Sequence, residues 1–252
     1  MKKIPFALMI NCLLLSTTMS YGNSDQLNGM THPFVTLTGA AAVTSGPNDS
    51  NYFTADSSLF TYDVDSTRQT RGVWGASFGV DSELMFFNPW RLQIGFGYYQ
   101  TGPFTLEGEL TQGVLPISSA QFNYDYRIIS RQLLAEAKVT RECHENFYPY
   151  LFVGIGAAFN RAENFQLYDF PEFLLFSPEF KNNTITSFTY SIGLGIDYEF
   201  MSHFLLGVGY RFTDLGRTNL GKGYIDTFSL GPTLNQSNIY TNEFLVQLSY
   251  RV

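Results

Sequence analysis

Apolar and polar residues alternate along most of this chain with a period of two. Residues 204–212 put Phe204, Leu206, Val208, Tyr210 and Phe212 on one face and Leu205, Gly207, Gly209 and Arg211 on the other. Successive side chains of a β-strand point to opposite faces, so this segment is predicted to be a strand with one apolar face and one face of mostly small or charged residues. The pattern recurs about eight times. It predicts strands at 33–43, 71–84, 91–101, a fourth ending near 140, a fifth following 149, and then 187–200, 204–212 and 241–252.

The second face of these strands is made of small residues rather than of the Lys and Glu that a water-exposed face carries. It reads Gly75, Ser77, Gly79, Gly95, Gly97, Gly154 and Gly156 on three of the strands. A soluble eight-stranded carrier barrel would also alternate, but its polar face would meet water and be rich in charge. Small residues fit the narrow interior of a closed barrel, with the apolar face turned to lipid.

The connections between strands alternate between short and long. The short ones are 85–90, 141–148 and 201–203, and the long ones are 44–70, 102–121, 164–186 and 214–240. Outer-membrane barrels have short periplasmic turns and long extracellular loops, so this alternation predicts the orientation. A ten-stranded count is the rival, because residues 52–64 resemble a hairpin. The aspartates in that hairpin favour strands that project above the membrane.

The last strand carries a pattern typical of barrel assembly. It ends with Phe244, Val246, Leu248, Tyr250 and Val252 on one face. The chain resembles the eight-stranded outer-membrane proteins related to the transmembrane domain of outer membrane protein A and to the opacity-type surface antigens. The resemblance covers about 33–252 and implies an all-β, eight-stranded, antiparallel, up-and-down transmembrane barrel whose last strand is read by the barrel-assembly machinery. The family commonly ends in Phe, where this chain has Val252.

The amino terminus has the features of an export signal. Lys2 and Lys3 precede an apolar run that ends in small residues, which predicts a signal peptide at 1–22 and a barrel domain at 23–252. Without those lysines the 15 basic residues become 13, and against 22 acidic residues the mature chain has a net charge of −9. An acidic chain does not suit a nucleic-acid partner. We expect residence in the bacterial outer membrane, with Cys143 as the one cysteine of the mature chain.

The three histidines are the first candidates for catalytic chemistry. His32, His144 and His203 all fall at the predicted periplasmic end, away from the outer leaflet where a lipid-modifying dyad would act. No glycine pair extends to a dinucleotide-binding motif, and the ligand-type residues 142–145 are adjacent on a turn, where side chains rarely converge on a metal ion. We therefore expect no enzyme activity, no cofactor and no metal.

Charged residues occupy positions that face the predicted interior. These are Asp81, Glu83, Glu136, Lys138, Asp197, Glu199 and Arg251 near the periplasmic ends of their strands, and Arg211 and Glu243 facing each other higher up. An unpaired buried charge is costly, so charges of both signs in a narrow lumen should form pairs. The prediction is a plugged barrel, and the alternative is a gated pore.

The third long loop is unusually apolar. Its candidate interaction residues are Phe165, Leu167, Tyr168, Phe170, Phe173, Leu174, Leu175, Phe176 and Phe180. Three interpretations stay open: a hydrophobic cap over the barrel mouth, a surface for a partner protein, or an entrance for small hydrophobic molecules as in the family that resembles outer membrane protein W. The alternation places Arg131 on the lipid-facing side of its predicted strand, near the outer rim of the barrel. This position suggests contact with lipopolysaccharide phosphate.

These patterns together favour a structural or adhesin-like role at the cell surface. The expected partners are outer-membrane lipid, lipopolysaccharide and a host or envelope protein that binds the acidic, aromatic loops. A narrow channel or a conduit for small hydrophobic molecules is the alternative.

Overall fold

The structure is a computed structural model that describes residues 31–46, 49–55, 58–65, 68–83, 90–113, 120–143, 146–168, 179–225 and 228–252. The chain divides into two compact units, Met1–Met30 and Thr31–Val252, and only the second lies in the described residues. The predicted signal peptide at 1–22 therefore lies outside them and stays a prediction. No helix in the described segments is long and apolar enough to cross a membrane.

Thirteen strands make up the described part of the second unit. They are β1 Thr31–Ser45, β2 Ser50–Ala55, β3 Ser58–Val64, β4 Arg68–Glu83, β5 Trp90–Gln112, β6 Ala120–Arg141, β7 Phe147–Tyr168, β8 Glu179–Phe180, β9 Asn183–Met201, β10 Phe204–Asp214, β11 Thr218–Ile225, β12 Phe228–Gln236 and β13 Tyr240–Arg251. All eight predicted strands are present, and most extend beyond their predicted bounds at one end or both.

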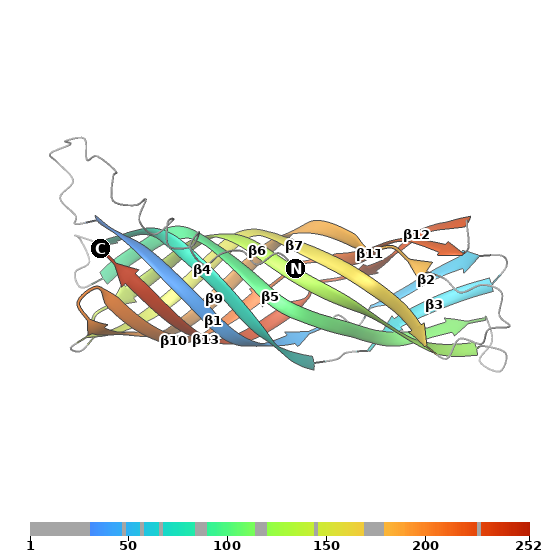
Figure 1. Ribbon diagram of the computed structural model, residues 1–252, viewed down its shortest axis with the longest axis horizontal. Coiled ribbons are helices and arrows are strands. Elements are labelled where there is room, and N and C mark those ends of the chain that lie inside the picture. Colours follow the sequence, from blue (N-terminus) through green and yellow to red (C-terminus); the bar gives the residue numbers. More distant parts are fainter. Residues whose placement is uncertain are drawn as a thin grey trace, which may run out of the picture. The chain divides into compact units, whose positions relative to one another are not determined.

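Eight of these strands close into a ring. Their order is β5-β4-β1-β13-β10-β9-β7-β6, and β6 pairs again with β5. Every pairing is antiparallel, and the first and last strands meet in a register that sets Phe34 opposite Arg251. Figure 1 shows these strands running side by side and tilted along one tube. The prediction of an eight-stranded antiparallel barrel is confirmed.

The two faces of the ring differ as the alternation predicts. Outward side chains such as Phe188 and Leu151 are 68% and 63% exposed, whereas inward ones such as Thr36 and Gln93 are buried. Aromatic residues gather outside the ring at both ends of the strands. Trp90, Phe147, Tyr198, Phe204 and Tyr250 lie near the short turns, and Trp74, Phe159, Tyr190, Phe212 and Tyr240 lie toward the long loops. Such girdles are typical of a lipid-facing wall.

The expected long loop at 102–121 is largely strand, which corrects the sequence interpretation. β5 continues to Gln112 and β6 begins at Ala120, so the two strands pair well beyond the ring. A register shift between Thr101 and Phe104 marks a β-bulge, which changes the face to which each later residue points. Phe104, Leu106 and Leu110 then turn inward and are at most 2% exposed, and their burial favours continued strand.

Two further pieces of sheet extend the tube at its long-loop end, where Figure 1 draws β2, β3, β11 and β12. The β2–β3 hairpin pairs with the far end of β5, and β11 pairs with both β12 and β8. The hairpin thus lies beyond the ring instead of within it, which confirms the preference for projecting strands over a ten-stranded barrel. We call this region, built from β2, β3, β8, β11, β12 and the far ends of β5, β6 and β7, the loop-end extension.

Candidate functional site

Glycines on the inner wall of the ring make room for the charged side chains of neighbouring strands. A Cβ atom on Gly97 would lie 2.3 Å from Glu136 Oε1, and one on Gly207 would lie 2.2 Å from Asp197 Oδ1. Real atoms do not approach so closely, so these positions accept only glycine while the carboxylates stay where they are. The small inner face seen in the sequence therefore creates the space for a set of polar side chains.

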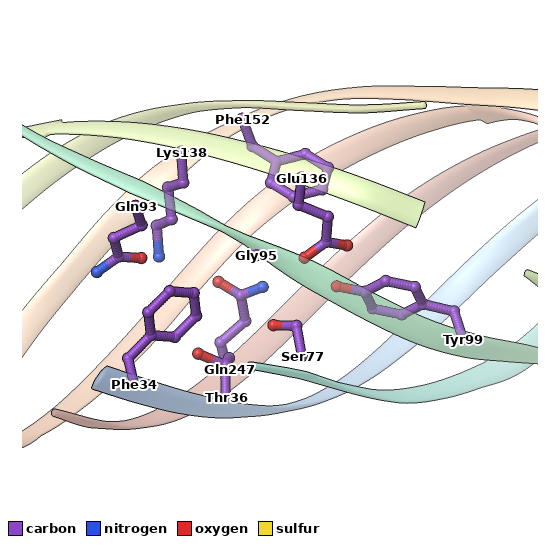
Figure 2. Close-up of a pocket in the computed structure, with 10 residues that line it drawn as sticks. All are labelled: Phe34, Thr36, Ser77, Gln93, Gly95, Tyr99, Glu136, Lys138, Phe152 and Gln247. Carbon is purple, nitrogen blue, oxygen red and sulfur yellow. The ribbon is translucent and has the colours of Figure 1, made fainter. Parts of the chain in front are cut away.

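The middle of the lumen encloses a cavity of about 20 Å³. Its walls are Phe34, Thr36, Ser77, Gln93, Gly95, Tyr99, Glu136, Lys138, Phe152 and Gln247, and Figure 2 shows Glu136 and Gln247 pointing into it. A cavity of this size holds about one water molecule. Oε1 of Glu136 and Oε1 of Gln247 have no hydrogen-bond partner among the described residues, so two unpaired acceptors lie in the wall of this cavity.

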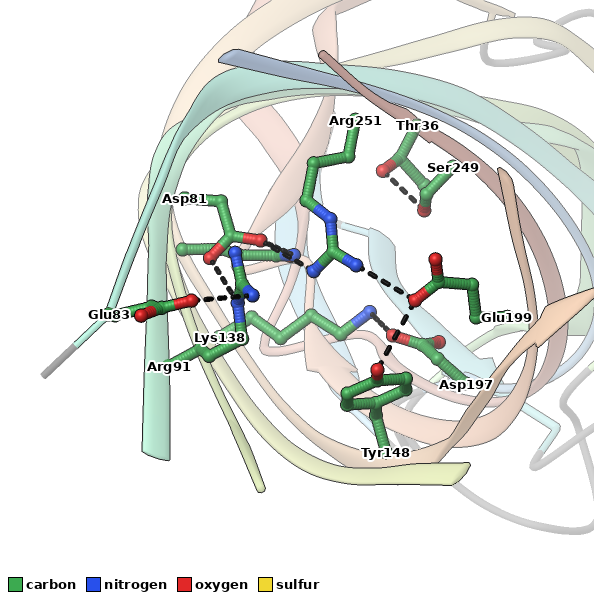
Figure 3. A network of polar contacts seen from close by, with 11 residues as sticks. Thr36, Asp81, Glu83, Arg91, Lys138, Tyr148, Asp197, Glu199, Ser249 and Arg251 are labelled. Atoms are coloured by element: carbon green, nitrogen blue, oxygen red, sulfur yellow. Dashed lines mark hydrogen bonds and ion pairs between the residues drawn. The ribbon is translucent and has the colours of Figure 1, made fainter. Parts of the chain in front are cut away.

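Ion pairs fill the lumen toward the short turns, as drawn in Figure 3. Arg91 and Arg251 each approach a different oxygen of Asp81 at 3.2 Å, and Arg251 also reaches Glu199 at 3.1 Å. The Lys138 ammonium lies 2.5 Å from an oxygen of Asp197. Asp81 and Asp197 are 0% and 2% exposed, so each buried carboxylate has a cationic partner.

Neighbouring strands position this network by their register. Asp81 on β4 lies opposite Gln93 on β5, and Gln93 lies opposite Lys138 on β6. Gln93 donates a hydrogen bond to Asp81, and the Tyr148 hydroxyl donates one to Glu199. Residues far apart in the sequence therefore meet because they occupy the same few rungs of the ring.

A separate ion pair closes the lumen higher up. Arg211 on β10 lies opposite Glu243 on β13, and its guanidinium nitrogens lie 2.6 and 2.8 Å from Oε2 of that carboxylate. The guanidinium also stacks over the ring of Tyr99 at 4.0 Å from its centroid, and Thr241 donates a hydrogen bond to Oε1 of Glu243. Arg211 and Glu243 are 1% and 0% exposed, which makes this a fully enclosed pair. A second cavity beside Arg211 measures only about 10 Å³.

The interior of the loop-end extension is apolar. Its core consists of Phe60, Tyr62, Val64, Phe104, Leu106, Leu110, Phe122, Tyr124, Tyr126, Ile128, Ala162, Phe180, Leu215, Leu220, Leu234 and Ile239. We call this set the cap core. Phe53, Phe165 and Leu167 pack against it, and aromatic rings meet at short centroid distances such as 5.0 Å between Phe165 and Phe180. Burial raises the pKa of the Tyr62, Tyr124 and Tyr126 hydroxyls well above their ordinary value.

The apolar third loop contributes to this core at both of its described ends. Phe165, Leu167 and Phe180 point inward, whereas Tyr168 is 44% exposed and bonds to Asp125. The other candidate interaction residues, Phe170, Phe173, Leu174, Leu175 and Phe176, lie outside the described residues. Of the three interpretations, the described ends of the loop have the contacts expected of a hydrophobic cap.

Asparagine side chains join strands of the extension where backbone pairing is missing. Asn51 on β2 exchanges two hydrogen bonds with the backbone of Asn235 on β12, at 2.8 and 3.1 Å. The backbone N–H of Asn164 donates a hydrogen bond to Oδ1 of Asn182 at 3.0 Å. The Asn183 amide donates to Asn219 at 2.6 Å. The Asn51 bonds hold β2 beside β12, and the Asn182 bond holds β7 beside the segment that leads into β9. Side-chain bonds thus link parts of the extension that backbone pairing does not join.

The outer surface of the extension is acidic. Asp63 on β3 lies directly opposite Glu109 on β5, and Glu107 on β5 lies opposite Asp125 on β6. Like charges in opposed positions of a sheet are destabilising, so folding alone does not favour this arrangement. With Asp65 beside them, these five residues form the surface that we call the acidic face.

The predicted lumen residues thus fall into two groups and one isolated member. Asp81, Glu83, Lys138, Asp197, Glu199 and Arg251 lie in the lower network, Arg211 and Glu243 form the upper pair, and Glu136 lies between them at the larger cavity. Arg91, Tyr99 and Tyr148 were missed. Arg91 is the second residue of β5 opposite Glu83, so aligning the two strands across their turn would have found it.

The remaining predicted residues lie on the outer wall or near the turns. Phe244, Val246, Leu248, Tyr250 and Val252 of the assembly pattern are all exposed on the outer side of the last strand. His32 lies opposite Asp81 at the start of β1, and His203 lies in the turn before β10 with a positive φ of 79°. His144 lies outside the described residues. Cys143 is an exposed free thiol.

Comparisons with known proteins agree with this architecture. The chain matches the family model for the outer membrane protein beta-barrel domain over residues 30–251, which includes every strand of the ring. No curated protein matches it.

Among solved structures the chain is similar to OprG from Pseudomonas aeruginosa, at 17% identity with 90% of this chain and 99% of that chain covered and a TM-score of 0.45. It is also similar to Neisserial surface protein A, at 14% identity, 86% and 96% coverage and a TM-score of 0.41. The outer membrane protease OmpT from Escherichia coli matches at 8% identity, 91% and 100% coverage and a TM-score of 0.48.

Proposed function

Because this chain belongs to the family of outer membrane β-barrel proteins, we propose that it is a surface-interaction protein whose loop-end extension binds a partner outside the cell. It resides in the bacterial outer membrane. Proteins of this architecture carry their long loops on the extracellular side, so the extension is the part that faces the surroundings.

The observation that carries the proposal is the way the loops are built. They form paired strands around an apolar core, and asparagine side chains join the strands that do not pair. Ordered strands present their outer side chains in fixed positions, which lowers the entropy that a partner's binding must overcome. Long loops need no such construction if they only connect strands.

The filled interior also favours a role at the surface. From the short turns upward, the lumen contains a network of ion pairs, an enclosed Arg211–Glu243 pair and the cap core, with described cavities of about 20 and 10 Å³. A hydrated ion needs a continuous wider path. We therefore expect the refolded protein to give no discrete conductance steps in a planar bilayer.

The acidic face is the binding surface that we propose. Its carboxylates lie in opposed pairs on β3, β5 and β6, and Tyr52 on the neighbouring β2 is 76% exposed. Opposed carboxylates repel each other and destabilise the sheet. A cationic partner surface would relieve this repulsion on binding, so the arrangement favours such a partner. Tyrosine adds contact area at a low entropic cost.

Adherence of living cells tests this proposal. A non-adherent bacterial host that displays the protein should bind epithelial monolayers several-fold better than the same host without it. Replacing Asp63, Glu107 and Glu109 by the matching amides should remove most of that gain. Glu142→Gln is the matched control, because Glu142 is an exposed carboxylate at the short-turn end of the barrel. Equal adherence of the amide variant and the wild type would reject the acidic face as the binding surface.

A conduit for small hydrophobic molecules is the second candidate, and the apolar character of the cap core is what favours it. The side chains of that core are at most 7% exposed, so a molecule could pass only if they moved aside. Discrete conductance, or uptake of a hydrophobic solute that rises when the cap core is reduced in volume, would support this candidate against surface interaction.

A further inference from the structure

Three arginines lie together on the outer wall where the lipid-facing surface ends. Arg131 on β6 lies opposite Gln100 on one side and Phe159 on the other, and Gln100 lies opposite Trp74 on β4. Trp74 and Phe159 belong to the outward aromatic girdle, and tryptophan and tyrosine girdles mark the level of lipid headgroups. Arg131 is exposed, so it lies at headgroup level with its side chain outside the barrel.

The register brings Arg161 and Arg127 beside it. Arg161 on β7 lies opposite Ile129, and Arg127 lies opposite Glu163. Arg161 is therefore the diagonal cross-strand neighbour of both Arg131 and Arg127, at the roughly 7–8 Å that separates such positions. All three arginines point outward and are exposed. We call them the rim arginines.

The rim arginines have an excess of positive charge. Arg161 pairs with Glu163 at 2.9 Å, and in the described part of the chain neither Arg127 nor Arg131 forms an ion pair. Arg127 lies two residues from Asp125 and diagonally opposite Glu107, so these carboxylates offset its charge. Arg131 has no carboxylate opposite it or diagonal to it on β5 or β7, so Arg131 and Arg161 together with Glu163 keep a local charge of +1. Like charges on adjacent strands repel, so an anion at this position would stabilise the arrangement.

The wall directly beneath the rim arginines is apolar and open. On the same two strands, Leu133 is 52% exposed and Ile155 is 59% exposed. A ligand that carries both an anionic group and hydrocarbon chains would contact the arginines and this wall together. A free phosphate ion would gain only the first contact.

We propose that the rim arginines bind a phosphate of a phosphorylated glycolipid in the outer leaflet, while its acyl chains lie along Leu133 and Ile155. Arginine presents its donors in a planar fork that matches two phosphate oxygens, and charge-assisted hydrogen bonds of this kind are stronger than neutral ones. Arg131 and Arg161 would hold the phosphate from adjacent strands. Arg127 would contribute charge from the rung above. This site does not rest on the proposed function, and it borders the acidic face where Arg127 lies beside Asp125 and Glu107.

Binding of lipid A to the folded protein in detergent micelles tests the proposal. The probes are lipid A with both phosphates, the same lipid without phosphate, and inorganic phosphate, each titrated while the shift in unfolding midpoint is measured. The wild type should bind the phosphorylated lipid at least about tenfold more tightly than the dephosphorylated one. Inorganic phosphate should give no shift at equal concentration. Tight binding of inorganic phosphate, or equal binding of the two lipids, would overturn the lipid site.

Matched variants locate the site. Arg131→Ala/Arg161→Ala should weaken binding of phosphorylated lipid A by about tenfold or more, and Arg131→Lys/Arg161→Lys should recover part of it, because lysine keeps the charge but not the fork. Arg141→Ala is the control, since Arg141 is an exposed arginine beside Trp90 at the opposite end of β6. These outward side chains do not pack in the interior, so circular dichroism should find every variant folded. Equal loss in Arg141→Ala, or no loss in the double variant, would reject the assignment.

Discussion

The membrane-level lumen and the cap core occupy the same tube and have opposite chemistry. In the ring, side chains such as Ile94 and Phe96 of β5 point outward and Gln93 points inward. Beyond the bulge after Thr101, the same strand points Leu106 inward and leaves Glu107 outside. The strand keeps its period of two, but its apolar face changes sides. A wall that passes from lipid to water must invert in this way, because its outer surface meets a different solvent.

The position of this inversion along the strand indicates where the membrane ends. Below the bulge, inward polar groups need partners, and the lumen supplies them as ion pairs. Above the bulge, water solvates the outer face, and burial of apolar side chains stabilises the interior. The lumen should therefore depend on pairing and the cap core on packing.

The largest effect is expected at the enclosed ion pair. Arg211→Ala leaves the Glu243 carboxylate in a site that is 0% exposed, without its cation. Removing one partner of a buried pair destabilises proteins by about 3–5 kcal/mol. The free energy of unfolding, measured by urea titration of the refolded protein in micelles, should fall by that amount.

The control for this prediction removes both charges. Arg211→Met/Glu243→Leu replaces the pair by apolar side chains of similar volume, which is often neutral or stabilising. This double variant should regain most of the stability lost in Arg211→Ala. A double variant as unstable as the single one would mean that Tyr99 stacking and Thr241 bonding, not the ion pair, stabilise this level of the lumen.

The next effect is expected in the cap core. Leu110 is 0% exposed among Phe60, Tyr62 and other apolar side chains, so Leu110→Ala should cost about 2–5 kcal/mol by loss of burial and creation of a cavity. Because the cap core lies beyond the ring, the loss should appear as faster proteolysis of β2, β3 and β11 while the ring stays protected. Proteolysis followed by mass spectrometry distinguishes the two regions. Uniform loss of protection over both would show that cap and ring unfold as one unit.

The ring was predictable because its alternation is uninterrupted within each strand. Residues 204–212 and 244–252 have the inward and outward faces that the sequence predicts, and the strand order follows from short turns and closure. The pairing of Arg211 with Glu243 also follows from counting along two neighbouring strands. Local periodicity determines these features, so one sequence suffices.

The extension was not predictable in the same way. Residues 104–112 alternate as well, with their apolar residues at even positions as in 91–101, so the pattern gives no sign that these positions turn from the outer to the inner face. The bulge that exchanges the two faces has no unique residue signature. Gly102 and Pro103 at the bulge are as consistent with the start of a loop as with a bulge within a continuing strand. The Asn51–Asn235 bridge joins residues 184 positions apart, and no local pattern encodes such a contact. Non-local pairing and solvent therefore determine what periodicity alone leaves open.

A smaller effect is expected from adding one methyl group to the inner wall. The Cβ of Gly207→Ala would overlap Asp197, whose carboxylate pairs with Lys138, so the pair must separate or shift. Overpacking of this kind costs about 1–3 kcal/mol. Gly39→Ala is the matched control, because a Cβ at Gly39 has no atom within 4 Å. Urea midpoints that fall for both variants alike would attribute the loss to glycine replacement in a strand and not to the lumen network.

The smallest effect is a pH dependence confined to the cap core. Burial raises the pKa of Tyr62, Tyr124 and Tyr126 above the ordinary tyrosine value of about 10, so the folded extension favours their neutral forms. The resulting stability is complete below about pH 10 and is lost as pH rises from there toward the folded-state pKa values. Proteolysis of β2 and β3 should therefore accelerate as the pH rises above about 10, while the ring stays protected. Replacing the three tyrosines by phenylalanine should abolish that acceleration at little cost near neutral pH. The Tyr62 and Tyr126 hydroxyls have no hydrogen-bond partner within the described residues, and the Tyr124 hydroxyl loses one long bond of 3.3 Å to the carbonyl oxygen of Asp63. Acceleration that persists in the triple variant would assign the alkaline sensitivity to other groups, and with it remove the evidence that tyrosine burial stabilises the cap.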